Sequence, residues 1–169
     1  LLLRDLDELV NQQLAKMLFA NPQRIDYYDR YQEIIDAYNA EQNRATIEKT
    51  FMDLMELASS LDTEQQRYVR EGFSSDEELS VYDLLFSENL TKQEIETIKK
   101  VSVDLLTKIK QQIAKLDHWT DKQETKAIVD NLIRNTLWQE LPNSYDVNDI
   151  QTYQKKIYEY VYMRYPEVA

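Results

Sequence analysis

The stretch that decides the fold is residues 91–116, which read TKQEIETIKKVSVDLLTKIKQQIAKL. It opens with Thr91 and Glu94, a pair with the spacing of a capping box, in which each side chain satisfies a backbone amide at a helix start. Apolar residues then recur every three or four positions, which is the period of one helix face. The stretch therefore predicts a long amphipathic helix whose inward stripe is Ile98, Val101, Leu105, Ile109, Ile113 and Leu116.

The same spacing continues in both directions, and residues that break helices are rare. The 169 residues include one Gly and three Pro, and so few breakers favour long helices with short connections. The sequence thus predicts an all-α, helical bundle-like domain of about seven helices with no significant sheet. Residues 1–72 are expected to form N-terminal helices and residues 73–169 a C-terminal helical subdomain, together making one compact domain.

Particular residues are expected to begin and end these helices. Gly72 can adopt a left-handed cap without steric cost, and Ser75 can cap a helix that starts with acidic side chains. A second capping box is predicted over residues 120–123, and Asp146 or Asn148 is expected to cap the last helix. The residues expected in the core are Leu54, Leu105, Ile109, Leu132, Ile133, Tyr153 and Ile157.

The net charge of −11 is distributed unevenly along the chain. Residues 1–98 carry 21 acidic and 9 basic side chains, a net of −12, whereas residues 99–169 carry 10 acidic and 11 basic, a net of +1. A strongly negative surface repels phosphate, so the first half should not bind DNA tightly. The second half is nearly neutral, so it could make limited contacts with DNA.

Other features of the sequence limit the class of protein to which the chain can belong. The chain has no Cys, which excludes disulfides and fits a reducing compartment such as the cytoplasm. No apolar run approaches the roughly 20 residues of a membrane span, and there is no signal-peptide pattern. Because the chain begins Leu1-Leu2-Leu3 without Met, we interpret it as a piece of a longer protein.

Residues for catalysis and cofactor binding do not occur in recognisable patterns. A P-loop needs several glycines near phosphate, and Gly72 stands alone. Zinc and di-iron sites need more histidines than the single His118. Asp117 and His118 could form an acid/base pair, but a polar turn is favoured because no nucleophile is nearby in the sequence. The prediction is that this chain has no catalytic, cofactor-binding or metal-binding residue.

The last predicted helix carries the most informative surface. One apolar stripe runs from Ile150 to Val161, and a second, rotated stripe holds Tyr158, Tyr162 and Tyr165. A helix that is apolar on two faces is either enclosed in its bundle or partly covered by a partner, and Tyr is favoured at interfaces. Both interpretations stay open. The candidate partner-binding residues are Trp119, Tyr158, Tyr162 and Tyr165 as anchors, with Lys155, Lys156 and Arg164 on the rim.

Four segments of the chain carry recognisable motifs in a fixed order. Residues 77–85, EELSVYDLL, are similar to an acidic-Leu-x-x-Tyr-Asp-x-Leu segment, and residues 113–123, IAKLDHWTDKQ, to an Asp-Trp turn before a Lys-rich helix. Residues 141–145, LPNSY, match a Leu-Pro-x-x-Tyr loop, and residues 157–165, IYEYVYMRY, match a terminal Tyr-rich helix. Together the four segments resemble the C-terminal part of type I restriction motor subunits. His118 departs from the pattern, because the family often has Asp directly before Trp.

The resemblance implies the C-terminal helical domain of the R (motor/endonuclease) subunit. The full subunit would carry nuclease and motor domains and would translocate DNA with ATP and Mg²⁺, but none of those sites lies in this piece. The domain is implicated in docking the motor onto the methyltransferase core of modification and specificity subunits. The expected partners are that core and the motor domains of the same chain, with DNA in the full complex but not bound tightly here, and no membrane. The expected location is the bacterial cytoplasm.

Three other interpretations remain open. The chain could be a free-standing helical scaffold or regulatory protein, or an enzyme whose site is not recognisable from the sequence. It could also be a DNA-contacting arm, whose binding would fall steeply with salt. The lysines available for such an arm are Lys99, Lys100, Lys108, Lys110, Lys115, Lys122 and Lys126.

The isolated chain is predicted neither to hydrolyse ATP nor to cut DNA, because the residues for nucleotide and metal binding are not recognisable in it. Phosphate release from ATP and nicking of plasmid DNA, both with Mg²⁺, measure this directly. Mg²⁺-dependent turnover that persists at constant specific activity through successive purification steps would refute the prediction.

Overall fold

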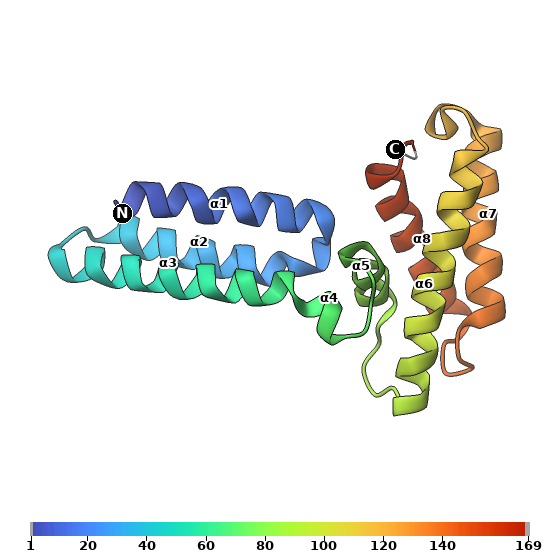
Figure 1. Cartoon of the computed structure of the whole chain (residues 1–169), viewed down its shortest axis with the longest axis horizontal. Coiled ribbons are helices and arrows are strands. Elements are labelled where there is room, and N and C mark those ends of the chain that lie inside the picture. The colour runs from blue at the N-terminus through green and yellow to red at the C-terminus, as the bar shows by residue number, and fades with distance from the viewer. Residues whose placement is uncertain (1, 168–169) are drawn as a thin grey trace. The chain divides into compact units, whose positions relative to one another are not determined.

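The computed structural model describes residues 2–167, and this part of the chain consists of helices and turns without a strand. The predicted all-α fold is confirmed. Within the described residues, eight α-helices and two short 3₁₀ helices follow one another (Figure 1). They are α1 (Leu3–Ala20), η1 (Pro22–Arg24), α2 (Ile25–Ala40), α3 (Arg44–Gln65), α4 (Arg67–Arg70), α5 (Asp76–Leu85), α6 (Lys92–Ala114), η2 (Trp119–Asp121), α7 (Gln123–Glu140) and α8 (Val147–Arg164).

The chain divides into two compact units, Leu1–Ser80 and Val81–Ala169, so the division falls inside α5. The sequence places the boundary earlier, after residue 72. Gly72 does adopt the left-handed conformation, with a φ of +87°, and its N–H donates to the carbonyl of Val69 at 3.1 Å. The glycine therefore ends α4, as predicted, while the compact units divide further along the chain.

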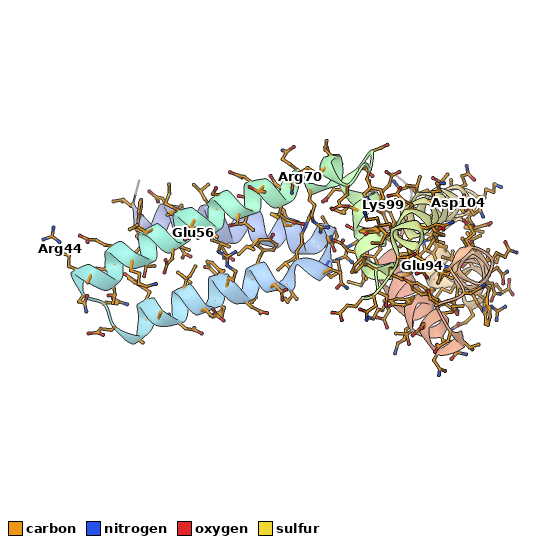
Figure 2. All side chains as sticks on the ribbon, turned by 90° about the horizontal axis from the view of Figure 1, so that it is seen from below. Arg44, Glu56, Arg70, Glu94, Lys99 and Asp104 are labelled. Carbon is orange, nitrogen blue, oxygen red and sulfur yellow. The ribbon has the colours of Figure 1, made fainter. Side chains whose placement is uncertain are left out.

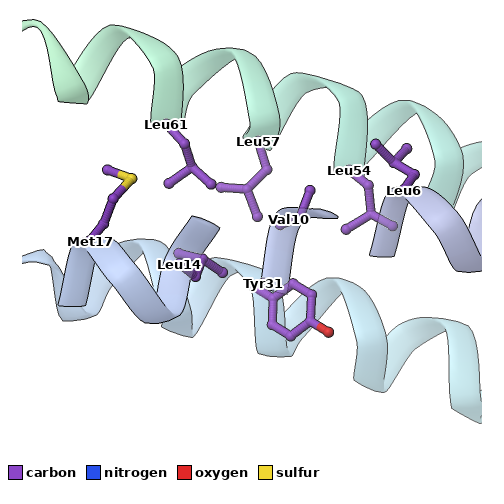
Figure 3. Packing of buried hydrophobic residues seen from close by; sticks show 8 residues of the cluster. All are labelled: Leu6, Val10, Leu14, Met17, Tyr31, Leu54, Leu57 and Leu61. Carbon is purple, nitrogen blue, oxygen red and sulfur yellow. The ribbon is translucent and has the colours of Figure 1, made fainter. Parts of the chain in front are cut away.

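The first unit contains a bundle in which α3 packs against both α1 and α2. Each helix turns its apolar stripe inward, because burying that stripe removes apolar surface from water. Figure 3 shows the stripes of α1 and α3 facing each other, with the ring of Tyr31 from α2 near Val10. The buried residues are Leu6, Val10, Leu14 and Met17 of α1, Tyr31 of α2, and Leu54, Leu57 and Leu61 of α3.

Buried charges join three segments of the first unit. Arg24 of η1 is only 3% exposed, and its Nε donates to Oε2 of Glu64 in α3 at 2.8 Å. The two Nη atoms of Arg24 donate to the carboxylate of Asp76 at 3.0 and 2.6 Å. Arg67 donates two further hydrogen bonds to Glu64, at 2.9 and 3.0 Å. We refer to Arg24, Glu64, Arg67 and Asp76 as the Arg24 network.

The network shifts the pKa values of Arg24 and Glu64 in the direction that keeps both side chains charged. Burial raises the pKa of Glu64, but hydrogen bonds from Arg67 and Arg24 lower it more, so the net pKa lies below that of a free glutamate. Burial likewise lowers the pKa of Arg24, and hydrogen bonds to Asp76 and Glu64 more than reverse this. A buried charge is tolerated only when it is paired in this way.

The second unit is built on α6, α7 and α8, with α7 packed against both of the others. Burial of Leu105, Ile109, Ile133 and Ile157 is confirmed, as is burial of Leu54 in the first unit. The predicted burial of two other residues was wrong, since Leu132 and Tyr153 are half-buried. The adjacent Ile133 occupies the inner position on α7, and the ring of Tyr153 packs beside Tyr145 at 5.5 Å between ring centroids.

Two of the predicted helix starts are confirmed. Thr91 and Glu94 form the expected capping box at α6, with Thr91 Oγ1 accepting from the amide of Glu94 at 3.1 Å. Asp146, rather than Asn148, caps α8 and forms a capping box with Asp149. Both boxes are local patterns of side chain and backbone, which is why the sequence reveals them.

The capping box predicted over residues 120–123 was wrong. Residues Trp119–Asp121 form η2, and α7 begins at Gln123 after Lys122, whose side chain makes no capping hydrogen bond. The hydroxyl of Thr125 donates instead to the carbonyl of Trp119 at 2.6 Å. Burial of the tryptophan ring draws residues 119–121 into a tight turn, so the helix starts later than the spacing suggests.

Replacing Glu64 with Gln is expected to lower the free energy of unfolding by roughly 3 kcal/mol at neutral pH, because it removes the negative charge that neutralises a buried arginine. The Glu64 pKa is lowered by folding, so its stabilising effect is complete above the unfolded pKa near 4.5 and is lost as the pH falls through the folded value. Urea unfolding at several pH values measures both effects, and the variant should show a weaker acid dependence.

A matched control is Glu48→Gln, which alters an exposed pair with Arg44 whose side chains are 93% and 67% exposed. Exposed pairs contribute little, so this variant should unfold like the parent chain. Equal stability of the two variants would mean that the Arg24 network does not stabilise the first unit.

Candidate functional site

The candidate site lies at the end of α8, where aromatic residues recur at helical spacing. Ile150, Ile157, Tyr160 and Val161 of this helix are buried, and they fix its rotation within the second unit. The opposite faces of α8 are therefore directed away from the core. They carry Lys155, Lys156, Glu159, Tyr162 and Met163, all of which are exposed.

Trp119 is completely buried, at 0% exposure. It follows His118, whose φ of 48° lies in the left-handed region and turns the chain sharply. The indole Nε1–H donates to the carbonyl oxygen of Tyr165 at 2.7 Å, which satisfies the only polar atom of the ring. This hydrogen bond ties the turn between α6 and α7 to the residue that ends α8.

Two tyrosines of α8 pack edge-on against the buried indole. The ring centroid of Tyr158 lies 6.0 Å from that of Trp119 at an interplanar angle of 82°, and the values for Tyr162 are 5.8 Å and 84°. Edge-to-face pairs of this kind are favourable because the positive edge of one ring meets the negative face of another. We call Trp119, Tyr158 and Tyr162 the aromatic cluster.

Exposure increases outward through the aromatic cluster. Trp119 is fully buried, Tyr158 is half-buried and Tyr162 is 39% exposed. Burial, and then the negative charge of Asp130, raise the pKa of Tyr158, so its hydroxyl stays protonated and can donate a hydrogen bond. The cluster thus presents a fixed aromatic edge with a polar hydroxyl to solvent.

The last two predicted residues hold the end of α8 against its own unit. The Arg164 guanidinium carbon lies 4.6 Å from the centroid of the Tyr160 ring, and burial lowers the pKa of Arg164. Tyr165 packs edge-on against Tyr160 at 6.1 Å, with Lys110 Nζ 5.5 Å from the centroid of its own ring. Arg164 and Tyr165 are both half-buried, so they contribute to packing within the unit.

The seven predicted partner-binding residues therefore do not form one surface. Trp119 is inside the core, which fits the alternative left open by the sequence, that its ring closes the domain's own interior. Arg164 and Tyr165 pack on Tyr160. The residues that face solvent along one side of α8 are Lys155, Tyr158 and Tyr162, with Lys156 beside them.

Tyr145 is a structural residue whose role the sequence did not indicate. It is 5% exposed, and its hydroxyl donates to the carbonyl of Leu85 at 2.6 Å. Its own amide donates to the carbonyl of Pro142 at 3.0 Å, which closes the turn after α7. The Leu-Pro-x-x-Tyr segment is thus a turn that directs a buried tyrosine onto the end of α5, and the motif itself was the available signal.

Several lysines of the predicted DNA-contacting arm are engaged within the chain. Lys108 Nζ lies 3.0 Å from Asp104 and 2.9 Å from Glu140, which joins α6 to α7. Lys99 and Lys110 lie over tyrosine rings, at 5.9 and 5.5 Å from the centroids of Tyr82 and Tyr165. The ion pairs of Lys108 offset part of the positive charge that α6 offers to phosphate.

The part of the chain that the structure describes contains no group of three or more His, Asp or Glu residues arranged to hold a metal ion. His118 lies near Asp117 and Glu167, at 3.5 and 3.4 Å, and the three side chains are 59%, 91% and 70% exposed. This arrangement is a solvated polar turn. Among the described helices, none is long and apolar enough to cross a membrane.

A family model described as "Type I restriction enzyme HindI endonuclease subunit-like, C-terminal" matches residues 1–165. The chain belongs to this family. A search of curated proteins and a search of solved structures found no match. The resemblance to type I restriction subunits that the four sequence segments indicate is therefore confirmed.

The structure gives structural roles to the segments that resemble the family. Leu79, Tyr82 and Leu85 of the first segment are all buried, at 0%, 7% and 0% exposure. Trp119 of the second segment and Tyr145 of the third are buried and hydrogen-bonded. The segments that suggested this endonuclease-subunit family are thus largely core and turn residues.

Replacing Trp119 with Phe is expected to destabilise this HindI-like C-terminal domain by about 2–4 kcal/mol, because it leaves a cavity and removes the donor to the Tyr165 carbonyl. The matched control is Trp138→Phe, which changes a 49% exposed tryptophan and should alter stability by less than about 0.5 kcal/mol. Urea unfolding followed by circular dichroism compares them. Similar losses in both variants would contradict the central position given to Trp119.

Proposed function

We propose that this domain docks the motor/endonuclease subunit of a type I restriction enzyme onto its methyltransferase core of modification and specificity subunits, in the bacterial cytoplasm. Family membership supports the parent enzyme. The observation that carries the docking proposal is the solvent edge of the aromatic cluster, where Tyr162 is 39% exposed above a fully buried Trp119.

An aromatic edge held in this way suits a binding site for physical reasons. A tyrosine that is already fixed by its neighbours loses little conformational freedom when a partner covers it. Tyr also offers a large apolar area and a hydroxyl that can find a hydrogen-bond partner. Interfaces gain most of their binding free energy from a few such anchors surrounded by polar residues.

Charged residues around the aromatic edge complete the proposed surface. Lys155 and Lys156 are exposed on α8 and precede Tyr158 and Tyr162 by roughly one or two turns. Their charge would face a partner surface with acidic residues, and such rim charges affect association rate and specificity more than affinity. In this proposal Lys155, Tyr158 and Tyr162 contact the core enzyme, and Trp119 positions the two tyrosines.

The remaining predicted residues act on the same surface indirectly. Arg164 and Tyr165 would hold the end of α8 in place through Tyr160, and the Tyr165 carbonyl fixes the indole. In this proposal ATP and Mg²⁺ belong to the motor and nuclease parts of the subunit, and this domain supplies no cofactor ligand. Loss of docking would abolish restriction because translocation and cleavage depend on assembly.

In the intact endonuclease subunit, Tyr162→Ser is expected to weaken binding to the purified methyltransferase about tenfold or more, because it removes an interface anchor. Its melting temperature should stay close to that of the parent, since the side chain is partly exposed. The binding constant is measured by titration of the two purified components, together with DNA cleavage by the mixture.

A matched control is Tyr28→Ser, which makes the same change at a tyrosine of α2 with a similar exposure of 37%. Binding by this variant should be unchanged. If Tyr162→Ser assembles normally, or if it weakens binding no more than Tyr28→Ser does, the proposed surface is wrong. The variant Lys155→Glu, at an exposed position, tests the surface without altering the aromatic cluster.

A further inference from the structure

The first unit contains a second surface feature that the docking proposal does not use. Between α1 and α3 lie two hollows in succession along the bundle, of about 460 and 450 Å³. One is lined by Leu2, which precedes α1, and Leu3 of α1, with Ile47, Phe51 and Met52 of α3. The other is lined by Leu6, Leu9 and Val10 of α1 with Ala58 of α3, and toward one end by glutamines and the basic Lys16.

We call the two hollows together the α1/α3 groove. Residues 6, 9, 13 and 16 of α1 recur at helical spacing, so they lie on one side of that helix. Gln13 Nε2 donates to Asp62 Oδ1 at 3.2 Å across the surface between the same two helices. From Ile47 to Gln65 the groove runs about 27 Å along α3, from the rise per residue of a helix.

The groove has an unusual amount of apolar surface open to solvent. Among its lining residues, Leu2 is 67% exposed, Leu9 56% and Met52 70%. Isolated exposed apolar residues are ordinary, but a continuous set along a groove marks an interaction site. The unbranched side chain of Met adapts its shape to different apolar partners, and it is frequent on surfaces that bind amphipathic helices.

The net charge of the first unit indicates which kind of partner the groove would attract. Residues 1–80 carry 17 acidic and 8 basic side chains, which gives a net charge of −9. Some of the few basic residues are already paired on the surface: Arg44, labelled at the start of α3 in Figure 2, lies 3.2 Å from Glu48. A second copy of this chain would bring another −9 to the interface, and nucleic acid or an anionic membrane would be repelled as well. A basic partner would be attracted.

We propose that the α1/α3 groove binds an amphipathic helix of another polypeptide, with an apolar stripe facing the groove and basic residues flanking that stripe. The partner helix places apolar residues, spaced at i, i+3, i+4 and i+7, in the two hollows, as amphipathic helices do in other apolar grooves. A helix of about 18 residues matches the length of the groove. Its basic residues lie against the acidic surface of the first unit.

The test uses the full chain and three designed 18-residue peptides of known composition. One carries a leucine stripe with lysines on the remaining faces, one has the same stripe with glutamates, and one has the lysine composition with the leucines scrambled. Fluorescence anisotropy at physiological salt measures each dissociation constant. The striped lysine peptide is expected to bind at least about tenfold more tightly than either of the others.

Groove variants locate the binding site. Met52→Glu in the first hollow and Leu9→Glu in the second change exposed residues, so the fold should persist, and each should weaken the striped lysine peptide about tenfold. The control Val69→Glu adds the same charge at a 58% exposed position outside the lining of the two hollows and should leave binding unchanged or slightly tighter.

Several results would overturn this proposal. Equal binding of the striped and scrambled lysine peptides would mean that charge alone attracts them. Equal binding of the lysine and glutamate peptides would exclude a basic partner. Sedimentation that shows a dimer of the chain, dissociated by Met52→Glu, would make a second copy the occupant. A failure of Tyr162→Ser to affect methyltransferase binding would not bear on the groove, because that residue lies in the other unit.

Discussion

The first unit depends on the buried pairing of Arg24 with Glu64 and Asp76. These residues come from η1, the end of α3 and the start of α5, and they are separated by 40 and 52 positions in the sequence. A guanidinium that is 3% exposed cannot lose its carboxylates without leaving a charge in an apolar setting. The ends of these segments are therefore stabilised together, which makes local fraying of any one of them costly.

In the second unit, segments distant in sequence are also held together, but no buried ion pair holds them among its described residues. There a buried indole, a backbone carbonyl and two tyrosine edges connect the turn before α7 with the end of α8. The polar atom of the indole is satisfied, so the cluster contributes apolar burial without an unpaired donor. Because the outer tyrosine remains partly exposed, the same cluster offers a surface as well as a core.

The sequence predicted the features that depend on local patterns. Helical spacing and the capping residues Thr91 and Asp146 act within one turn of the chain, so the helices and several of their ends could be recognised. Burial of Arg24 could not be recognised from the sequence, because its partner Glu64 is distant along the chain. No residue next to Arg24 indicates that it is buried. Trp119 was recognised as important, but its placement in the core depends on the carbonyl of Tyr165, which no spacing reveals.

The contact between Tyr145 and Leu85 bears on which parts of this domain can change in length. The last carbonyls of a helix have no partner within it, and a buried hydroxyl here satisfies that of Leu85, the residue at which α5 ends. An insertion before Leu85 would rotate the helix and move this carbonyl away from the hydroxyl. Residues 86–90 between α5 and α6 include the left-handed Asn89 and several exposed positions. This connection can therefore lengthen or shorten during evolution, while the end of α5 stays fixed.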